Sequence, residues 1–274
     1  GPRSVQTLEP PLFRSFFKRT TLVVLSWHMN NFSQLDDVLA TIGGVTGVYA
    51  ARVAGGPVLE RHADQPFALA SVSKLPLMIH LFRLADQELL DLSARHAVLE
   101  SERVAGSGLL QYLDAGSNLT LTDLIRLMMM ISDNMATDQL LSYTSKQAVE
   151  QDMHALGFSS VRMPHSIREM LGSYLPDGPD TPYSQVWAYF KDPNRVAPTD
   201  AAGGDPKRGD AATPRDLARM LTALVNGELL SPASTDLAVR ILKDCQTNSR
   251  IPARLPKGTE VGHKTGTLNQ RTND

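Results

Sequence analysis

Ser71-Val72-Ser73-Lys74 opens the stretch that decides the fold, because a strongly apolar segment follows it as far as Gln87. Apolar residues recur there at helical spacing: Leu75, Met78, Ile79, Phe82 and Ala85. The pattern predicts a helix over 71–87. Residues three apart share one face of a helix, so we expect the Lys74 amine beside the Ser71 hydroxyl. A serine hydroxyl is a poor nucleophile unless a base activates it, and the pair therefore indicates nucleophilic catalysis.

The spacing of serine and lysine is a weak signal alone, because Ser15-Phe16-Phe17-Lys18 has it too, without an apolar helix after it. Two later motifs strengthen it: Ser132-Asp133-Asn134, between two predicted helices, and Lys264-Thr265-Gly266, in a predicted strand over 260–267. Each has an ordinary structural interpretation, the first as a helix cap and the second as a strand end with a turn glycine. All three in this order favour a nucleophile, its base, a proton relay and a cation for an anionic substrate.

The rest of the chain predicts an α+β fold. A helix opening at 31–34 precedes a hairpin of 46–53 with 58–61, and further helices are expected over 120–131, 134–144, 146–156, 214–226 and 231–245. Strands at both ends and helices between them predict a sheet assembled from both termini with an all-helical lobe inserted. The expected units are a tail or leader remnant over 1–31 and one domain over 32–274. Within that domain the α/β lobe comprises 32–68 and 214–274, and the helical lobe comprises 69–213.

Residues 172–211 form the longest predicted connection. They are rich in proline and glycine and also carry aromatic residues, so they are interpreted either as a functional loop over a cleft or as a solvated insertion.

Composition narrows the partners and cofactors. The 27 basic residues are offset by 29 acidic ones, which gives no sign of a nucleic-acid partner. Cys245 is the single cysteine and the seven histidines are scattered, so we expect no metal and no cofactor. No apolar run is long enough for stable membrane insertion, and the oligomeric state is left open.

The three motifs together resemble those of the class A β-lactamases and other penicillin-recognising serine hydrolases. The similarity runs from about Phe32 to the end of the chain. It implies a β-lactamase/DD-peptidase-like fold, a small-molecule substrate (a β-lactam or an acyl-peptide) and a periplasmic or secreted location, although no leader is clearly present.

The resemblance also implies a role for each motif residue. Ser71 is the acylated nucleophile, Lys74 its base and Ser132 the proton relay. Asn134 holds the substrate amide and Lys74, while Asp133 is structural. The substrate-binding set is completed by Lys264, Thr265, Gly266 and Thr267, with the backbone N–H groups of Ser71 and Thr267 forming an oxyanion hole.

Two features depart from the family pattern. Class A enzymes use a loop glutamate to align the hydrolytic water, and Ile167 falls at that position here. Glu169, two residues later, is the candidate general base, with a surface role as the alternative. Without such a base, deacylation slows. The chain also stops at Asp274, apparently without the last strands and the C-terminal helix, so we expect an unpaired edge on the strand that carries Lys264. Residues 21–26 are the one segment considered as its partner.

These observations leave three functions open. The first is a serine acyl hydrolase that opens a β-lactam amide through acyl-Ser71. The second is a penicillin-binding D-alanyl-D-alanine peptidase or esterase with slow deacylation. The third is a truncated, non-catalytic interaction module.

Overall fold

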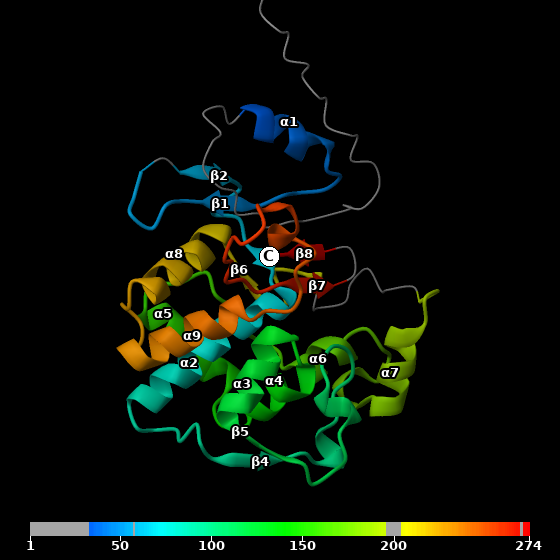
Figure 1. The fold of residues 1–274 in the computed structure, drawn as a ribbon. Helices are drawn as coiled ribbons and strands as arrows, with labels where there is room; N and C mark the ends of the chain where they lie inside the picture. The colour runs from blue at the N-terminus through cyan, green and yellow to red at the C-terminus, as the bar shows by residue number, and fades with distance from the viewer. Residues whose placement is uncertain (1–32, 57, 196–203, 269–270) are drawn as a thin grey trace, which may run out of the picture.

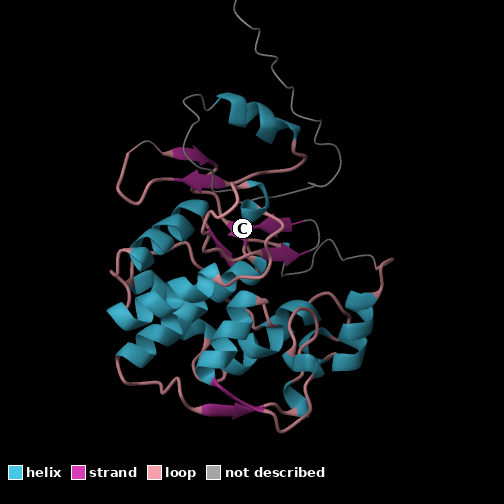
Figure 2. Ribbon diagram, viewed as in Figure 1, coloured by secondary structure: helices cyan, strands magenta, loops and turns pink. Residues whose placement is uncertain are grey.

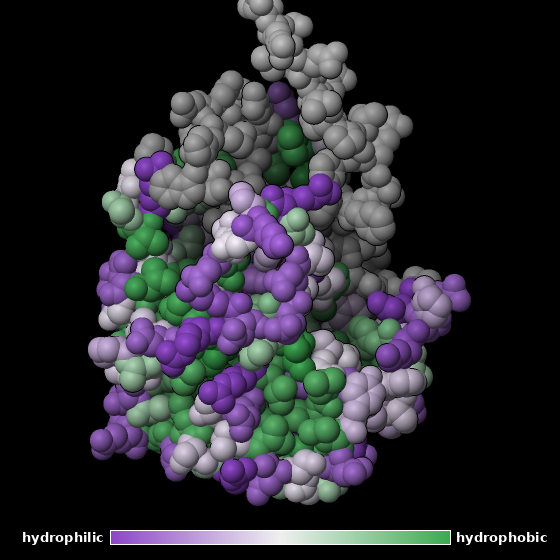
Figure 3. All heavy atoms as spheres, in the orientation of Figure 1, coloured by the Kyte–Doolittle hydropathy of each residue, from purple (hydrophilic) through white to green (hydrophobic). Residues whose placement is uncertain are grey.

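The computed structural model describes residues 33–56, 58–195, 204–268 and 271–274. The predicted tail over 1–31, including residues 21–26 and the serine–lysine pair at 15–18, lies outside them. The described chain is a mixed α and β structure in which helices dominate and the strands are short (Figure 2). On the face shown in Figure 3, polar and apolar residues are intermixed. None of the helices described is both long and apolar enough to pass through a bilayer.

The α-helices are α1 (Ser33–Thr41), α2 (Lys74–Asp86), α3 (Leu121–Met130), α4 (Asn134–Leu141), α5 (Lys146–Ala155), α6 (Ile167–Gly172), α7 (Tyr183–Lys191), α8 (Pro214–Val225) and α9 (Pro232–Lys243). The 3-10 helices are η1 (Ala70–Ser73), η2 (Glu100–Glu102), η3 (Leu110–Tyr112), η4 (Gly178–Asp180) and η6 (Ile251–Arg254).

The strands form antiparallel pairs. The pairs are β1 (Val48–Ala50) with β2 (Leu59–Arg61), β3 (Phe67–Ala68) with β6 (Ala211–Ala212), β4 (Arg95–Ala97) with β5 (Asn118–Thr120), and β7 (Gly266–Leu268) with β8 (Arg271–Asn273).

Helix α2 is the centre of the core. Leu77, Met78, Ile79 and Leu81 are fully buried, so the helix is enclosed on all sides and not only on the face that its spacing predicted. Helices α3, α5 and α9 pack against it (Figure 1). This packing fixes the first residue of α2, Lys74, in the interior.

Side-chain caps start the helices where the sequence predicted them. Thr120 Oγ1 accepts a hydrogen bond from Asp123 N at the start of α3, and Thr213 Oγ1 accepts one from Asp216 N at the start of α8. Asp133 caps α4 by accepting from Ala136 N at 2.9 Å. The predicted starts of these three helices are therefore confirmed. They could be predicted because each cap acts on an N–H group only three residues away.

The strand predicted over 260–267 is wrong for most of its length, since pairing begins only at Gly266. The preceding residues lie against the end of α9 instead, where His263 N donates to Leu242 O at 3.1 Å. Strand β8 pairs with one edge of β7, and no described strand pairs with the other edge, so the strand that follows Lys264 keeps one open edge.

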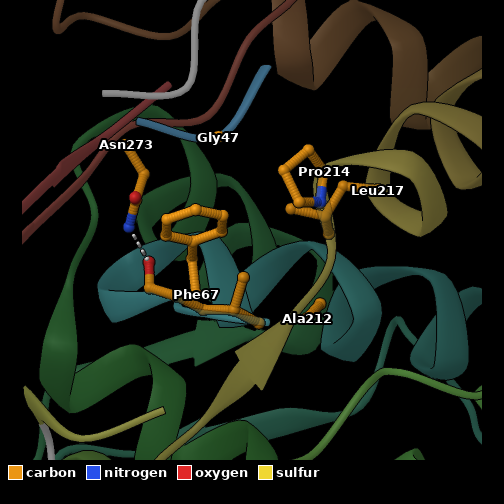
Figure 4. Close-up of a pocket in the computed structure, with 7 residues that line it drawn as sticks. Gly47, Phe67, Ala212, Pro214, Leu217 and Asn273 are labelled. Atoms are coloured by element: carbon orange, nitrogen blue, oxygen red, sulfur yellow. Dashed lines mark hydrogen bonds between the residues drawn. The ribbon is translucent and has the colours of Figure 1, made fainter. Parts of the chain in front are cut away.

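A sheet shared by both ends of the chain is not formed by the residues that the structure describes, because β1–β2 and β7–β8 are separate two-stranded sheets. The Asn273 side chain of β8 donates to Ala68 O and Leu69 O, both at 2.9 Å, so a side chain makes the connection to β3. Gly47, which directly precedes β1, lies against the Phe67 ring of β3, and both residues line a small apolar pocket (Figure 4). The pocket contains none of the three motifs.

Residues 172–211 are not one long loop. They contain η4 and α7, and α7 packs through Val186 and through an edge-to-face contact of Phe190 with Tyr174. The segment ends in β6, while residues 196–203 lie outside the described chain.

Candidate active site

The three motifs converge on one site. Ser71 lies in η1, Lys74 begins α2, Ser132 precedes α4, and Lys264 precedes β7, which contacts η1. Gly266 permits that contact, because a Cβ at this position would lie 2.5 Å from Leu69 O. The glycine of the third motif therefore serves a close approach of two backbones.

The Lys74 side chain is completely buried and fully engaged. Its Nζ donates to Ser132 O at 2.7 Å, to Ser132 Oγ at 3.1 Å and to Asn134 Oδ1 at 2.8 Å. Burial lowers the pKa of Lys74 well below its ordinary value, and the charge of Lys264 lowers it further. The lowered pKa makes Lys74 easier to deprotonate than an exposed lysine.

The Ser132 hydroxyl lies between two amines, 3.1 Å from Lys74 Nζ and 3.1 Å from Lys264 Nζ. Its backbone is in the left-handed region, with φ of 60°, which is unusual for a residue other than glycine. Ser107 Oγ supports this conformation by donating to Ser132 O at 2.6 Å.

Lys264 is nearly as buried as Lys74. Its Nζ also donates to Thr265 O at 2.7 Å, and burial lowers its pKa to about 8. The buried Thr265 and the exposed Thr267 follow it.

The two residues after Ser132 differ in role. Asp133 accepts from Leu109 N and Leu110 N besides capping α4, which fits the structural part predicted for it. Asn134 receives Lys74 Nζ on its oxygen and donates from Nδ2 to Ala105 O at 2.9 Å. Its amide therefore holds the lysine from one side.

Ser71 lies at the edge of this cluster and is half-buried. Its backbone carbonyl accepts from Lys74 N. Among the described residues, no hydrogen bond joins the Ser71 hydroxyl to Lys74 Nζ, which is directed to the second motif instead. The two side chains are thus neighbours on one helical turn, but the expected hydroxyl–amine hydrogen bond is not formed.

Glu169 is not brought into the cluster. Its carboxylate binds Lys146 Nζ and accepts from Ser166 N at 2.6 Å, while Ser166 Oγ accepts from Glu169 N, so the two residues form a capping box at α6. Burial alone would raise the pKa of the Glu169 carboxyl group. The hydrogen bonds from Lys146 and Ser166 outweigh burial and hold this pKa below its ordinary value. Ile167, the first residue of α6, is buried, and its N–H donates to Asp138 Oδ1 at 2.7 Å.

Arg250 is a site residue that the sequence analysis missed. Its guanidinium donates to Gly266 O at 3.0 Å, to Asn273 O and to Thr267 Oγ1. It lies fourteen positions before Lys264, outside any motif, and no local signal marks it. The β7–β8 hairpin brings it beside the third motif, so the site combines three basic side chains. In the part of the chain that is described, no group of three or more His, Cys, Asp or Glu residues is arranged to hold a metal ion.

Comparisons with known proteins give the family of the chain. The profile of the Beta-lactamase enzyme family matches residues 31–274, and the chain belongs to that family. No curated protein matches the chain in sequence.

Solved structures extend the similarity to the fold. A β-lactamase from Sphaerobacter thermophilus is 28% identical, with 87% of this chain and 80% of that chain covered and a TM-score of 0.69. An ancestral class A β-lactamase of Gram-negative bacteria is 26% identical, with 86% and 79% covered and a TM-score of 0.69. A point mutant of PBP-A, solved as an acyl-enzyme complex with penicillin G, is 25% identical, with 86% and 76% covered and a TM-score of 0.67.

Proposed function

We propose that this protein is a serine hydrolase of the β-lactamase type, in which the Ser71 hydroxyl attacks a β-lactam amide and forms an acyl-enzyme. The observation that carries this proposal is the Ser132 hydroxyl, which lies 3.1 Å from both Lys74 Nζ and Lys264 Nζ. A hydroxyl between two buried amines suits proton transfer, because each amine has a lowered pKa.

In the proposed acylation, neutral Lys74 takes the proton of the Ser71 hydroxyl as its oxygen bonds to the carbonyl carbon. The proton passes from Lys74 to Ser132 and on to the leaving nitrogen as the amide C–N bond breaks. The backbone N–H groups of Ser71 and Thr267 stabilise the oxyanion. Since Lys74 Nζ contacts Ser132 and Asn134 here, it must turn toward Ser71 for the first of these steps.

Substrate binding follows from the charges around Ser71. Lys264, Thr265 and Arg250 bind the carboxylate of the substrate, and Asn134 binds its acyl amide. Such a ligand is a small anionic molecule, a β-lactam or an acyl-peptide. Membership of the family favours a periplasmic or secreted location, where the protein would encounter such molecules.

One observation favours slow release of the product. Glu169 is engaged by Lys146 and by the N-terminus of α6, and Ile167 occupies the buried first position of that helix. We propose a structural role for Glu169, so that the acyl-enzyme lacks the general base that would activate water. A general base of this kind typically raises the rate of the step that it catalyses by roughly 100- to 10,000-fold. The protein then behaves as a penicillin-binding acyl-enzyme, as in the second of the three functions.

Burst kinetics with a chromogenic cephalosporin test the proposal. We expect one equivalent of rapid colour change followed by slow turnover, both lost in Ser71→Ala. Rapid continued turnover would favour an efficient lactamase. A folded protein with no burst would instead support the non-catalytic interaction module.

A further inference from the structure

His263, which directly precedes the third motif, is a buried histidine with an oxygen at each ring nitrogen. Nδ1 lies 3.1 Å from Asp274 Oδ1, and Nε2 lies 3.3 Å from Asn248 Oδ1. A neutral imidazole has one donor nitrogen, so the ring donates to both oxygens only as the imidazolium. The hydrogen bond to Asp274 raises the pKa of His263 to about 9, with the Cys245 thiol contributing.

Asp274 passes this contact on to the segment that carries Arg250. Its Oδ2 accepts from Ile251 N at 3.1 Å, and Ile251 directly follows Arg250. Asn248, on the other side of the imidazole, precedes Arg250 by two residues. The His263 ring therefore ties residues 248–251 at both ends to the segment of the third motif.

The Arg250 guanidinium is suited to receive an anion. It donates to two carbonyl oxygens and to the Thr267 hydroxyl, all uncharged, and no carboxylate among the described residues forms an ion pair with it. A guanidinium has five N–H groups, so three such bonds leave two for a ligand. A planar pair of N–H groups matches a carboxylate.

We propose that His263 is a positioning residue that selects for anionic substrates: by bridging Asp274 and Asn248 it fixes residues 248–251 so that Arg250 faces the carboxylate of the acyl donor. The inference rests on the proposed function, because it assigns a specificity to the same site. His263, which lies outside the three motifs, would thereby contribute to substrate recognition.

The test compares benzylpenicillin with its neutral methyl ester as acyl donors for Ser71. The second-order rate of acylation is measured for each by intact-protein mass spectrometry, and the carboxylate-to-ester ratio is the readout. In His263→Asn we expect this ratio to fall about tenfold, the size of one weakened charge-assisted hydrogen bond. Asp274→Asn, which breaks the same chain at its other member, is expected to lower the ratio similarly.

A double-mutant cycle shows whether the effect passes through Arg250. If it does, His263→Asn has no further effect on the ratio in an Arg250→Ala background. Equal falls in both backgrounds overturn the inference, since they would place the effect on Lys264 instead. An unchanged ratio in both His263→Asn and Asp274→Asn overturns it as well.

The matched control is His80→Asn. His80 is also buried and paired with a carboxylate, with Nδ1 2.9 Å from Asp152 Oδ2, but it packs between α2 and α5, away from the three motifs. We expect this change to lower the midpoint of thermal unfolding without moving the ratio, and a fall in the ratio contradicts the assignment to His263. A wild-type protein that neither donor acylates refutes the proposed function itself, which is a separate result.

Discussion

Replacing Glu169 by glutamine separates the two roles that a glutamate in this loop can have. In the structure its carboxylate closes a capping box with Ser166 and binds Lys146. Glutamine preserves the capping box, because its side-chain oxygen can still accept from Ser166 N. It loses the ion pair, and it cannot serve as a general base.

The two roles predict effects of very different size: a small loss of stability for the ion pair, and a large loss of deacylation rate for a general base. The Glu169 side chain is 36% exposed and that of Lys146 is 21% exposed, so the pair is screened and worth roughly 0.2–1 kcal/mol. Glu169→Ala would also remove half of the capping box, so glutamine is the cleaner replacement. If Glu169 were the general base, by contrast, its removal would lower the rate of deacylation by roughly 100- to 10,000-fold.

The assay follows acyl-Ser71 by intact-protein mass spectrometry after excess benzylpenicillin is removed, together with thermal unfolding of each variant. We expect Glu169→Gln to release the acyl group within a factor of about two of the wild-type rate, since it removes no group that contacts the cluster. Lys146→Met is the matched control, because it breaks the same ion pair and keeps the carboxylate. A loss of deacylation in Glu169→Gln with normal release in Lys146→Met would refute the structural role.

Two further changes test other parts of the site, and a third tests the buried carboxyl group of Asp210, which accepts from His165 N at 3.3 Å. Lys74→Met removes the proposed base and should slow acylation roughly 100- to 10,000-fold in stopped-flow measurements, and an unchanged rate would disprove its role. Ile167→Glu places a carboxylate at the start of α6, and we expect it to raise steady-state cephalosporin turnover at least about tenfold; no gain in a folded variant contradicts the missing-base explanation. Burial raises the pKa of Asp210 to about 7 from 3.8, so the native state holds a proton that the unfolded chain releases, and the free energy of unfolding falls as pH rises between those values. In Asp210→Asn this fall between about pH 4.5 and 7.5 should be smaller in urea denaturation, and an identical slope would show that another group is responsible.

Local signals account for the part of the fold that the sequence predicted. The caps Thr120 and Thr213 bind N–H groups three residues away, so their effect does not depend on distant contacts. The apolar run after Ser71 is also local and gave α2, although full burial of the helix reflects packing by α3, α5 and α9. The motif order could be recognised for the same reason.

Features that depend on tertiary contacts were not predictable. Val38 is apolar and lies beside Leu39 in α1, yet it is 58% exposed, because α1 packs on the β1–β2 hairpin through Leu39. The residues before Gly266 have a strand-like pattern, but the end of α9 takes the place of a partner strand. Arg250 reaches the site only through the β7–β8 hairpin, which no spacing in the sequence encodes.

The measurement that tests the central claim most directly is peptide mapping of the protein after brief exposure to benzylpenicillin. The account predicts a mass increase of one intact penicillin on the peptide that contains Ser71, persisting through the slow-turnover phase and missing in Ser71→Ala. An adduct on another residue, or one that survives in Ser71→Ala, would contradict it.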